Sequence, residues 1–358
     1  MKLLTVVGAR PQFVKAASVS RPLRERATEC LVHTGQHYDE ALSASQFRDL
    51  GLPDPDHVLV LPRRFDTAGA RVAHLIRALR TLIQDEAPDR VLIYGDTDST
   101  LAGALAAQIA GVSLAHVEAG LRSGRLAMPE EGNRIVADHL SDLLLCPVPS
   151  AAETLRREGA SGRIETPGDV MLDTFLAREA EFRTDDAATR LGVQAGNYVV
   201  ATLHRPENVD LQARLTDILN GLAAAETTVL LPAHPRARAA MEGWQAARAS
   251  RGGAGVRLID PLPYGELMAL VARAKGVLTD SGGLQKEAYF LGVPCATVRT
   301  ETEWPETFLH GWNQLVAATS AEVERAVRGF APGTGPADRA VFGGGCAARA
   351  IAELLVAG

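Results

Sequence analysis

The chain begins MKLLTVVGARPQFVK, residues 1–15, and this stretch sets the expectation for the fold. Its apolar run at 2–7 has the length and the Val and Leu content of a buried strand. Gly8 and Ala9 then turn the chain into a segment that we expect to be a helix. A short strand that passes directly into a helix is the first half of a βαβ unit, so this opening favours a parallel sheet covered by helices.

The same alternation continues along the chain. Residues 68–86 show apolar side chains at helical spacing, which predicts a helix with one buried face that ends before Pro88. We expect two parallel sheets of an α/β protein. The predicted strands are 2–7, 29–33, 90–94, 113–117, 142–146 and 162–165 in the first half, and 197–203, 227–232, 255–259, 276–279 and 294–298 in the second.

A chain of 358 residues is longer than a single hydrophobic core usually serves, so two domains are expected. Pro167 and Gly168 mark the end of the first domain, and we predict a long polar helix at 171–190 beyond them. A stretch rich in Gly, Pro and Ala predicts a second hinge at 331–345. The predicted domains are 1–168, joined by a last helix within 346–358, and 169–345.

Composition limits the classes of function. Hydrophobic residues make up 46% and charged residues 22% of the chain, and the net charge is −6. A mildly acidic protein of this kind is not expected to bind nucleic acid or a membrane surface. No stretch approaches the roughly 20 apolar residues of a membrane span, and the first apolar run is too short for a signal peptide. These features predict a cytoplasmic protein.

The cysteines give no sign of a metal site or a disulfide framework. Cys30, Cys146, Cys295 and Cys346 are scattered without any short paired spacing. We therefore expect buried free thiols and no bound metal.

Polar residues follow the predicted strands of the first half, where α/β proteins bind ligands. Arg10 and Lys15 on an opening helix favour an anion site, although a solvated first turn fits them equally well. Asp98 or Ser99 is expected to cap the next helix. Capping leaves Asp96 without a structural role, at the strand end and facing the presumed cleft. Glu118 follows strand 113–117. Glu130 and Glu131 open a further helix, where acids are common in any case.

The second half offers a complementary set. His204 follows strand 197–203, and Ser281-Gly282-Gly283 opens a helix whose backbone N–H groups could approach a diphosphate closely. Glu287 lies one turn inside that helix, where a carboxylate can bind a ribose diol, although the G-x-G-x-x-G fingerprint of dinucleotide folds is absent. Trp304 fits both the wall of a sugar pocket and a hydrophobic anchor.

Together these segments resemble the non-hydrolysing UDP-N-acetylglucosamine 2-epimerases. The motifs stand in family order and span most of the chain. They are GARPQFVK (8–15), TGQHYD (34–39), YGDTDST (94–100), HVEAGLRS (116–123), MPEEGNR (128–134), LHRPEN (203–208), TDSGGLQKEA (279–288) and RTETEWPE (299–306).

The resemblance implies two Rossmann-like domains that face a cleft, as in glycosyltransferase-B-like proteins, with a UDP-sugar substrate, no cofactor, no metal and a homodimeric assembly. It also assigns roles to individual residues. The implied catalytic residues are Asp96, Glu118, Glu130 and His204, and the implied substrate-binding residues are Arg10, Lys15, Arg134, Ser281, Gly282, Gly283 and Glu287.

In such an enzyme a carboxylate removes the proton from C2 while UDP leaves C1, and UDP then returns to the 2-acetamidoglucal with a proton on the opposite face. GARPQFVK with GDVMLD (168–173) is also similar to members that act on UDP-2,3-diacetamido-2,3-dideoxyglucuronic acid. Two rivals from other classes remain. A UDP-dependent glycosyltransferase shares the fold but seldom needs three acids at strand ends, and a nucleotide-sugar sensor has no use for carboxylates that repel its ligand.

Overall fold

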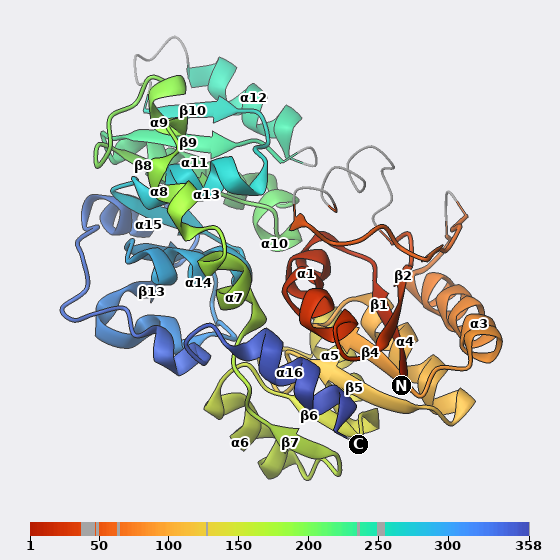
Figure 1. Ribbon diagram of the computed structural model, residues 1–358. Helices are drawn as coiled ribbons and strands as arrows, with labels where there is room; N and C mark the ends of the chain where they lie inside the picture. Colours follow the sequence, from red (N-terminus) through yellow and green to blue (C-terminus); the bar gives the residue numbers. More distant parts are fainter. Residues whose placement is uncertain are drawn as a thin grey trace. The chain divides into compact units, whose positions relative to one another are not determined.

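A computed structural model describes residues 1–36, 47, 50–62, 65–126, 128–234, 237–248 and 255–357 (Figure 1). The chain forms two compact units, which are Met1–Leu176 with Arg339–Gly358, and Ala177–Asp338. The sequence patterns placed these two boundaries at 168/169 and 345/346. Helix α7 (Val170–Leu176) belongs to the first unit, where Thr174 Oγ1 donates to the Val14 carbonyl at 2.9 Å.

The first unit is built on a parallel sheet of seven strands in the order β3-β2-β1-β4-β5-β6-β7. Six of these strands repeat the order of a Rossmann fold, and β7 extends it at one edge. The strands are β1 (Lys2–Val7), β2 (Thr28–His33), β3 (His57–Val58), β4 (Arg90–Tyr94), β5 (Ser113–Val117), β6 (Leu143–Leu145) and β7 (Arg163–Glu165).

Helices cover both faces of this sheet, and the alternation along β1 shows how. Leu3 and Val7 pack in a core with α1 (Arg10–Arg24) and α16 (Ala347–Val356), whereas Leu4 and Val6 pack in a second core with α3 (Ala68–Glu86) and α4 (Asp98–Ala110). In Figure 1 the last helix, α16, lies against the first, α1. The remaining helices are α5 (Pro129–Leu140), α6 (Pro149–Glu158) and the 3-10 turn η3 (Arg339–Phe342).

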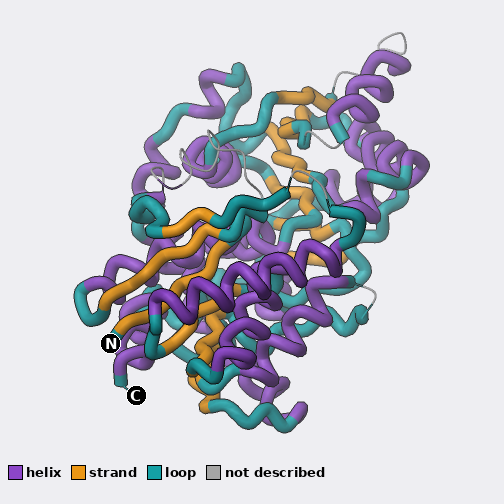
Figure 2. Tube along the Cα trace, turned by 90° about the vertical axis from the view of Figure 1, so that its right-hand side faces the viewer, coloured by secondary structure: helices purple, strands orange, loops and turns teal. Residues whose placement is uncertain are grey.

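The second unit repeats the design with a parallel sheet of six strands in the order β10-β9-β8-β11-β12-β13, again the Rossmann order. Figure 2 shows the strands of each unit side by side among helices. The strands are β8 (Tyr198–Thr202), β9 (Thr228–Pro232), β10 (Val256–Ile259), β11 (Gly276–Thr279), β12 (Cys295–Thr297) and β13 (Asn313–Leu315). The helices are α8 (Glu179–Thr184), α9 (Ala187–Arg190), α10 (Pro206–Val209), α11 (Gln212–Ala224), α12 (Arg238–Arg248), α13 (Tyr264–Ala272), α14 (Gly282–Leu291), η2 (Pro305–Gly311) and α15 (Ser320–Arg328).

The predicted α/β class with two parallel sheets is confirmed, but three local predictions need correction. Strand β3 has two residues and β13 is the segment Asn313–Leu315 with two exposed positions, so neither shows an apolar run in the sequence. The single helix predicted at 171–190 is instead α7, α8 and α9. Phe175 is buried in the first unit and Phe182 in the second, and one straight helix cannot supply both cores.

Two further predictions concern thiols and membranes. The four cysteines are free, and three are buried as expected, but Cys346 is exposed because it stands just before α16. Among the described residues, no helix combines the length and the apolar character that crossing a bilayer requires.

Asp173 ties the end of the chain to the first unit. Its carboxylate accepts hydrogen bonds from the backbone N–H groups of Ala347 at 3.2 Å and Ala348 at 3.0 Å, which are unsatisfied donors of the first turn of α16. A residue far away in sequence thus caps the last helix.

We predict that Asp173→Ala lowers the free energy of unfolding by about 1 kcal/mol, because two buried N–H groups lose their acceptor. Asp186→Ala is the matched control, since Asp186 is an exposed partner of Arg190 in a short helix. Urea denaturation followed by circular dichroism measures both. Equal effects of the two substitutions would contradict a capping role.

Candidate active site

The strand order fixes where a ligand site belongs in each unit. In a Rossmann sheet the crevice opens beyond the carboxyl ends of the two central strands, where the connections diverge in opposite directions. These strands are β1 and β4 in the first unit and β8 and β11 in the second. The residues that follow them include Arg10, Asp96, His204 and Ser281.

Glu118 stands directly after β5 and forms a buried ion pair with Lys15 of α1; the two residues are 9% and 6% exposed. The backbone of Glu118 is left-handed, with φ of 70°, a conformation that costs a residue other than glycine roughly 1 to 2 kcal/mol. Strain of this kind is concentrated at functional sites. The pair with Lys15 and the hydrogen bond from Glu118 N to the Leu145 carbonyl hold the residue in place.

The backbone of Gly95 lies directly next to this ion pair. It follows β4 with φ of 61°, and a Cβ at this position would lie 3.1 Å from Lys15 Nζ and 3.3 Å from Glu118 Oε2. The turn therefore needs glycine both for its backbone and for its closeness to the ion pair.

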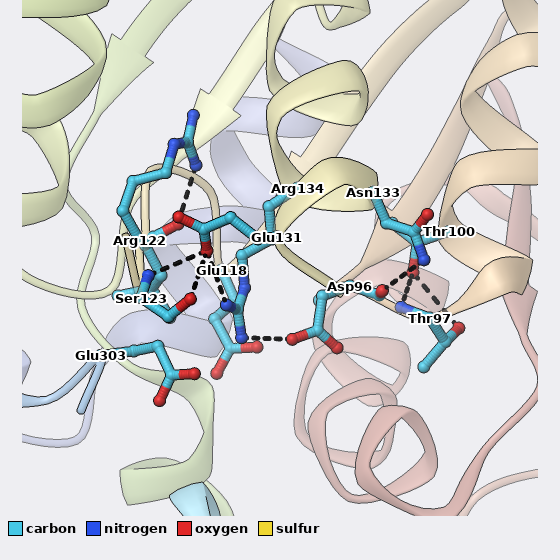
Figure 3. A network of polar contacts seen from close by, with 12 residues as sticks. Asp96, Thr97, Thr100, Glu118, Arg122, Ser123, Glu131, Asn133, Arg134 and Glu303 are labelled. Carbon is cyan, nitrogen blue, oxygen red and sulfur yellow. Dashed lines mark hydrogen bonds and ion pairs between the residues drawn. The ribbon is translucent and has the colours of Figure 1, made fainter. Parts of the chain in front are cut away.

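Asp96 comes next and is held by α5, as Figure 3 shows. Its carboxylate pairs with the Arg134 guanidinium, and its backbone carbonyl accepts a hydrogen bond from Asn133 Nδ2 at 2.9 Å. The structure thus brings together Asp96 with Arg134, and Lys15 with Glu118. The expected cap by Asp98 or Ser99 does not form, because Thr97 is the N-cap residue and Asp98 pairs with Arg71.

The two neighbouring glutamates at the start of α5 differ sharply. Glu130 is exposed, and the structure gives it no hydrogen bond within the described residues. Glu131 is buried and accepts from Ser123 N at 2.8 Å, Ser123 Oγ at 2.9 Å and Gly124 N at 2.8 Å (Figure 3). Burial raises the pKa of Glu131, but these donors outweigh it and hold the pKa below its usual range.

Arg10 is the first residue of α1 and is exposed. Gln12, two residues farther along, connects two parts of the unit, and sequence reasoning did not predict this role. Its Oε1 accepts from Gly8 N at 2.8 Å and Ala9 N at 3.1 Å, and its Nε2 donates to the Tyr94 carbonyl at 2.8 Å. Gln12 therefore joins the turn after β1 to the end of β4. Of the TGQHYD motif, residues 37–39 lie outside the described part of the chain.

In the second unit His204 is positioned by a buried carboxylate that sequence reasoning did not single out. His204 Nδ1 lies 2.8 Å from Asp280 Oδ1, and Asp280 also accepts from Arg205 N at 3.1 Å and Asn208 Nδ2 at 2.9 Å. Burial raises the pKa of Asp280, but the His204 and Asn208 donors more than offset it, so the pKa is lowered. The sequence did hold a signal for this contact, because Asp280 directly follows β11 and His204 follows the neighbouring strand β8.

The Ser281-Gly282-Gly283 turn opens α14 as predicted, with Ser281 as N-cap and its Oγ accepting from Leu284 N at 3.4 Å. Glu287 lies farther along this helix and is buried. Trp304 is a buried anchor, with the Lys286 ammonium 3.6 Å from its ring centre and its Nε1 3.6 Å from where a Cβ on Gly282 would lie.

One group among the described residues has the donor types of a metal site. Cys30, His57 and Glu86 bring their ligand atoms within 4.8 Å of one another. Cys30 lies in β2, His57 begins β3 and Glu86 ends α3, whereas Asp96 follows the carboxyl end of β4. The Glu86 carboxylate already pairs with Lys2 at 2.7 Å and His57 at 2.8 Å. This group stands apart from the acids at the strand ends.

Fold and side chains together define a two-unit α/β protein with two ion-paired acids after strands β4 and β5 of one unit and a helix start suited to anions in the other. Residues 21–356 match the model of the UDP-N-acetylglucosamine 2-epimerase family. The chain belongs to this family.

Two relatives and one solved structure support this family assignment. A UDP-2,3-diacetamido-2,3-dideoxy-D-glucuronate 2-epimerase of Pseudomonas aeruginosa is 43% identical over 99% of both chains. A UDP-N-acetylglucosamine 2-epimerase of Methanocaldococcus jannaschii is 35% identical over 91% of both. The crystal structure of the Methanocaldococcus jannaschii enzyme with UDP-GlcNAc and UDP covers 100% of each chain with a TM-score of 0.89 and 32% identity. The likeness confirms the glycosyltransferase-B-like fold expected from the motifs.

The contrast between Glu130 and Glu131 gives a test of which one is structural. We predict that Glu131→Gln lowers the free energy of unfolding at pH 7 by about 2 kcal/mol, because an amide places N–H groups against three donors. Stability from a lowered carboxyl pKa is present above the unfolded value of 4.5 and is lost as the pH falls through the folded value. The difference in unfolding free energy between Glu131→Gln and the wild type should therefore become smaller below pH 4.5.

Glu130→Gln is the control in the same denaturation series, and we expect it to change the free energy of unfolding by less than about 0.5 kcal/mol. A loss at Glu130 as large as that at Glu131 would contradict the assignment.

Proposed function

We propose that the protein is a non-hydrolysing epimerase that inverts C2 of UDP-N-acetylglucosamine to give UDP-N-acetylmannosamine. The observation that carries this proposal is the two carboxylates after the neighbouring strands β4 and β5 of the first unit, Asp96 and Glu118, each beside a cation. Acid and base groups on both faces of C2 are what an inversion by proton transfer needs. Membership of the epimerase family supports the same reaction.

The proposed chemistry is an elimination followed by an addition. A carboxylate takes the C2 proton, the C2–H electron pair becomes the C1–C2 double bond, and the C1–O pair leaves with UDP. UDP then adds back to C1 of the 2-acetamidoglucal while an acid delivers a proton to the opposite face of C2. We assign the proton transfers to Asp96, Glu118 and Glu130, with Lys15 and Arg134 orienting the first two carboxylates.

We assign recognition of the departing UDP to the second unit. The backbone N–H groups at the start of α14, at Ser281, Gly282 and Gly283, suit a diphosphate. His204 is held through Nδ1 by Asp280, so Nε2 is the ring nitrogen that would face the leaving group. Arg10 adds a cation in the first unit, and Glu287 is assigned to the ribose.

A second candidate substrate is favoured by one comparison. The Pseudomonas aeruginosa relative, 43% identical, is named for UDP-2,3-diacetamido-2,3-dideoxy-D-glucuronate. The reaction at C2 would be the same, and only the groups at C3 and C6 would differ. The ratio of kcat/KM for the two UDP-sugars decides between these candidates, and we expect UDP-N-acetylglucosamine to be preferred.

The central experiment follows the reaction by NMR in D₂O, with an ¹⁸O label in the oxygen that joins C1 to the diphosphate. We expect product with deuterium at C2 and with the label partly moved to non-bridging positions, because the C1–O bond breaks and re-forms. Asp96→Asn and Glu118→Gln should each lower kcat by at least about 10²-fold.

Several outcomes would contradict the proposal. Product with neither deuterium nor label movement would exclude elimination and re-addition. Free N-acetylmannosamine and UDP as final products would show hydrolysis instead. No change in UDP-N-acetylglucosamine unless an acceptor is added would indicate a glycosyltransferase.

A matched pair of glycines tests the Lys15–Glu118 pair. Gly95 and Gly111 have similar left-handed backbones, with φ of 61° and 68°, but only a Cβ on Gly95 would touch the ion pair, since nothing lies within 4 Å of one on Gly111. We predict that both alanine variants lose about 1 kcal/mol of stability and that only Gly95→Ala also lowers kcat, by at least about tenfold.

Thermal unfolding and steady-state kinetics of the two variants provide the measurement. A normal kcat for Gly95→Ala would mean that the geometry of the ion pair does not limit turnover.

A further inference from the structure

The acids of the first unit rest on a buried charged network that the proposed chemistry does not use. Its centre is His116, the residue before Val117 at the end of β5, which is fully buried. His116 Nδ1 lies 2.7 Å from Asp138 Oδ1, and His116 Nε2 lies 2.8 Å from the backbone carbonyl oxygen of Gly95.

Both partners of the His116 ring accept hydrogen bonds. A carbonyl oxygen has no proton to give, and a neutral imidazole donates from only one of its nitrogens. The other partner, Asp138, already takes hydrogen bonds from Arg122 Nη1 at 2.7 Å and Gly120 N at 3.2 Å on Oδ2. Donors on both of its oxygens favour the carboxylate form of Asp138.

Burial raises the pKa of Asp138, but the hydrogen bond and charge of His116 and the charge of Arg122 outweigh it, so the pKa is below its usual value. The Arg122 and Gly120 donors by themselves disfavour a protonated Asp138 facing a neutral ring. Two acceptors on one ring are satisfied only when both nitrogens carry hydrogen.

We propose that His116 is a positioning residue that donates from both ring nitrogens, to Asp138 and to the Gly95 carbonyl, and so holds the Gly95–Asp96 turn in place. The carbonyl that it holds belongs to the peptide bond between Gly95 and Asp96. Gly95 N also donates to the Val117 carbonyl at 3.0 Å, so both polar groups of Gly95 are tied to β5.

This clamp reaches both proposed acids. On one side of the turn, the Asp96 carboxylate meets Arg134 and its carbonyl meets Asn133. On the other side, Gly95 lies beneath Lys15 and Glu118. A neutral His116 would lose one of its two hydrogen bonds, and the turn would be free to shift under both carboxylates.

Charges around the network are balanced and come from several elements. Arg122 also pairs with Glu158 of α6 at 2.7 Å. Cations and anions therefore alternate through the network, in the order His116, Asp138, Arg122 and Glu158. The other titratable or charged groups near these residues are Lys15, Glu118, Cys146, Arg156 and His139, whose Nε2 lies 3.7 Å from Glu158 Oε2.

The first test observes the charge directly and needs no turnover. Full-length protein labelled with ¹⁵N-histidine is followed by NMR from pH 6 to pH 9, and the His116 signals are assigned by comparison with His116→Gln or through the backbone. We expect both ring nitrogens to keep the shifts of an imidazolium over this range. A neutral His116 ring at pH 8 in the wild type would overturn the proposal.

The second test is kinetic and rests on the proposed epimerase function. His116→Gln should lower kcat at least tenfold and leave KM and the calorimetric UDP affinity within threefold. In Asp138→Asn the ring loses its carboxylate partner, so we expect His116 to become titratable and kcat to fall as the pH rises and the ring becomes neutral. His74→Gln, on α3 and outside this network, should match the wild type.

The two tests fail separately. Wild-type kcat in both His116→Gln and Asp138→Asn, or a tenfold rise in KM with kcat unchanged, would remove the positioning role. A wild-type protein that does not epimerise either UDP-sugar would remove the proposed function, while the NMR titration would still decide the charge of His116.

Discussion

Repulsion between like charges is the constraint on which the first unit depends. Parallel strands deliver their carboxyl ends to one edge of the sheet, so Asp96 and Glu118, which follow the neighbouring strands β4 and β5, are brought together by the fold itself. Acids that gather at one edge repel each other and repel an anionic ligand. The structure answers this by giving each acid a cation from a helix, Arg134 of α5 for Asp96 and Lys15 of α1 for Glu118.

In the second unit a buried carboxylate holds hydrogen-bond donors in place. Asp280 is buried without exposure to solvent and accepts from the backbone of His204 and Arg205, so a carboxylate organises the donors of the turn after β8. Arg299 and Glu303 form a similar buried pair in the loop after β12, with contacts of 2.7 and 3.0 Å. Asp280 and the Arg299–Glu303 pair are thus compensated by contacts within the second unit.

Much of the fold and of the position of the site could be predicted from the sequence, because both depend on local patterns. Apolar runs gave eleven strands near their observed places, and the strand order then fixed the switch points. Strands β3 and β13 lack a buried apolar run, and the break in the helix predicted at 171–190 depends on which core each phenylalanine enters.

The partners of the acids could not be predicted from the residues alone. Lys15 and Glu118 are 103 residues apart, and no local spacing connects them. The left-handed backbone of Glu118 could not be predicted either, since glutamate has no preference for this conformation. The motif pointed to Glu130 rather than Glu131, and only the structure shows that Glu131 is occupied in fixing the Ser123–Gly124 turn.

Separate cations also bear on how the proposed inversion could run in both directions. A proton must leave one face of C2 and arrive at the other, so two acids must be in opposite protonation states at the same moment. Carboxylates that share one proton titrate as a single coupled pair, which ties the state of each to the other. Glu118 pairs with Lys15 of α1, whereas Asp96 pairs with Arg134 of α5, which also lies 3.5 Å from Glu131, so the two acids respond to different charged partners. Under the proposed reaction, this separation would let either acid serve as the base, which a freely reversible epimerisation requires.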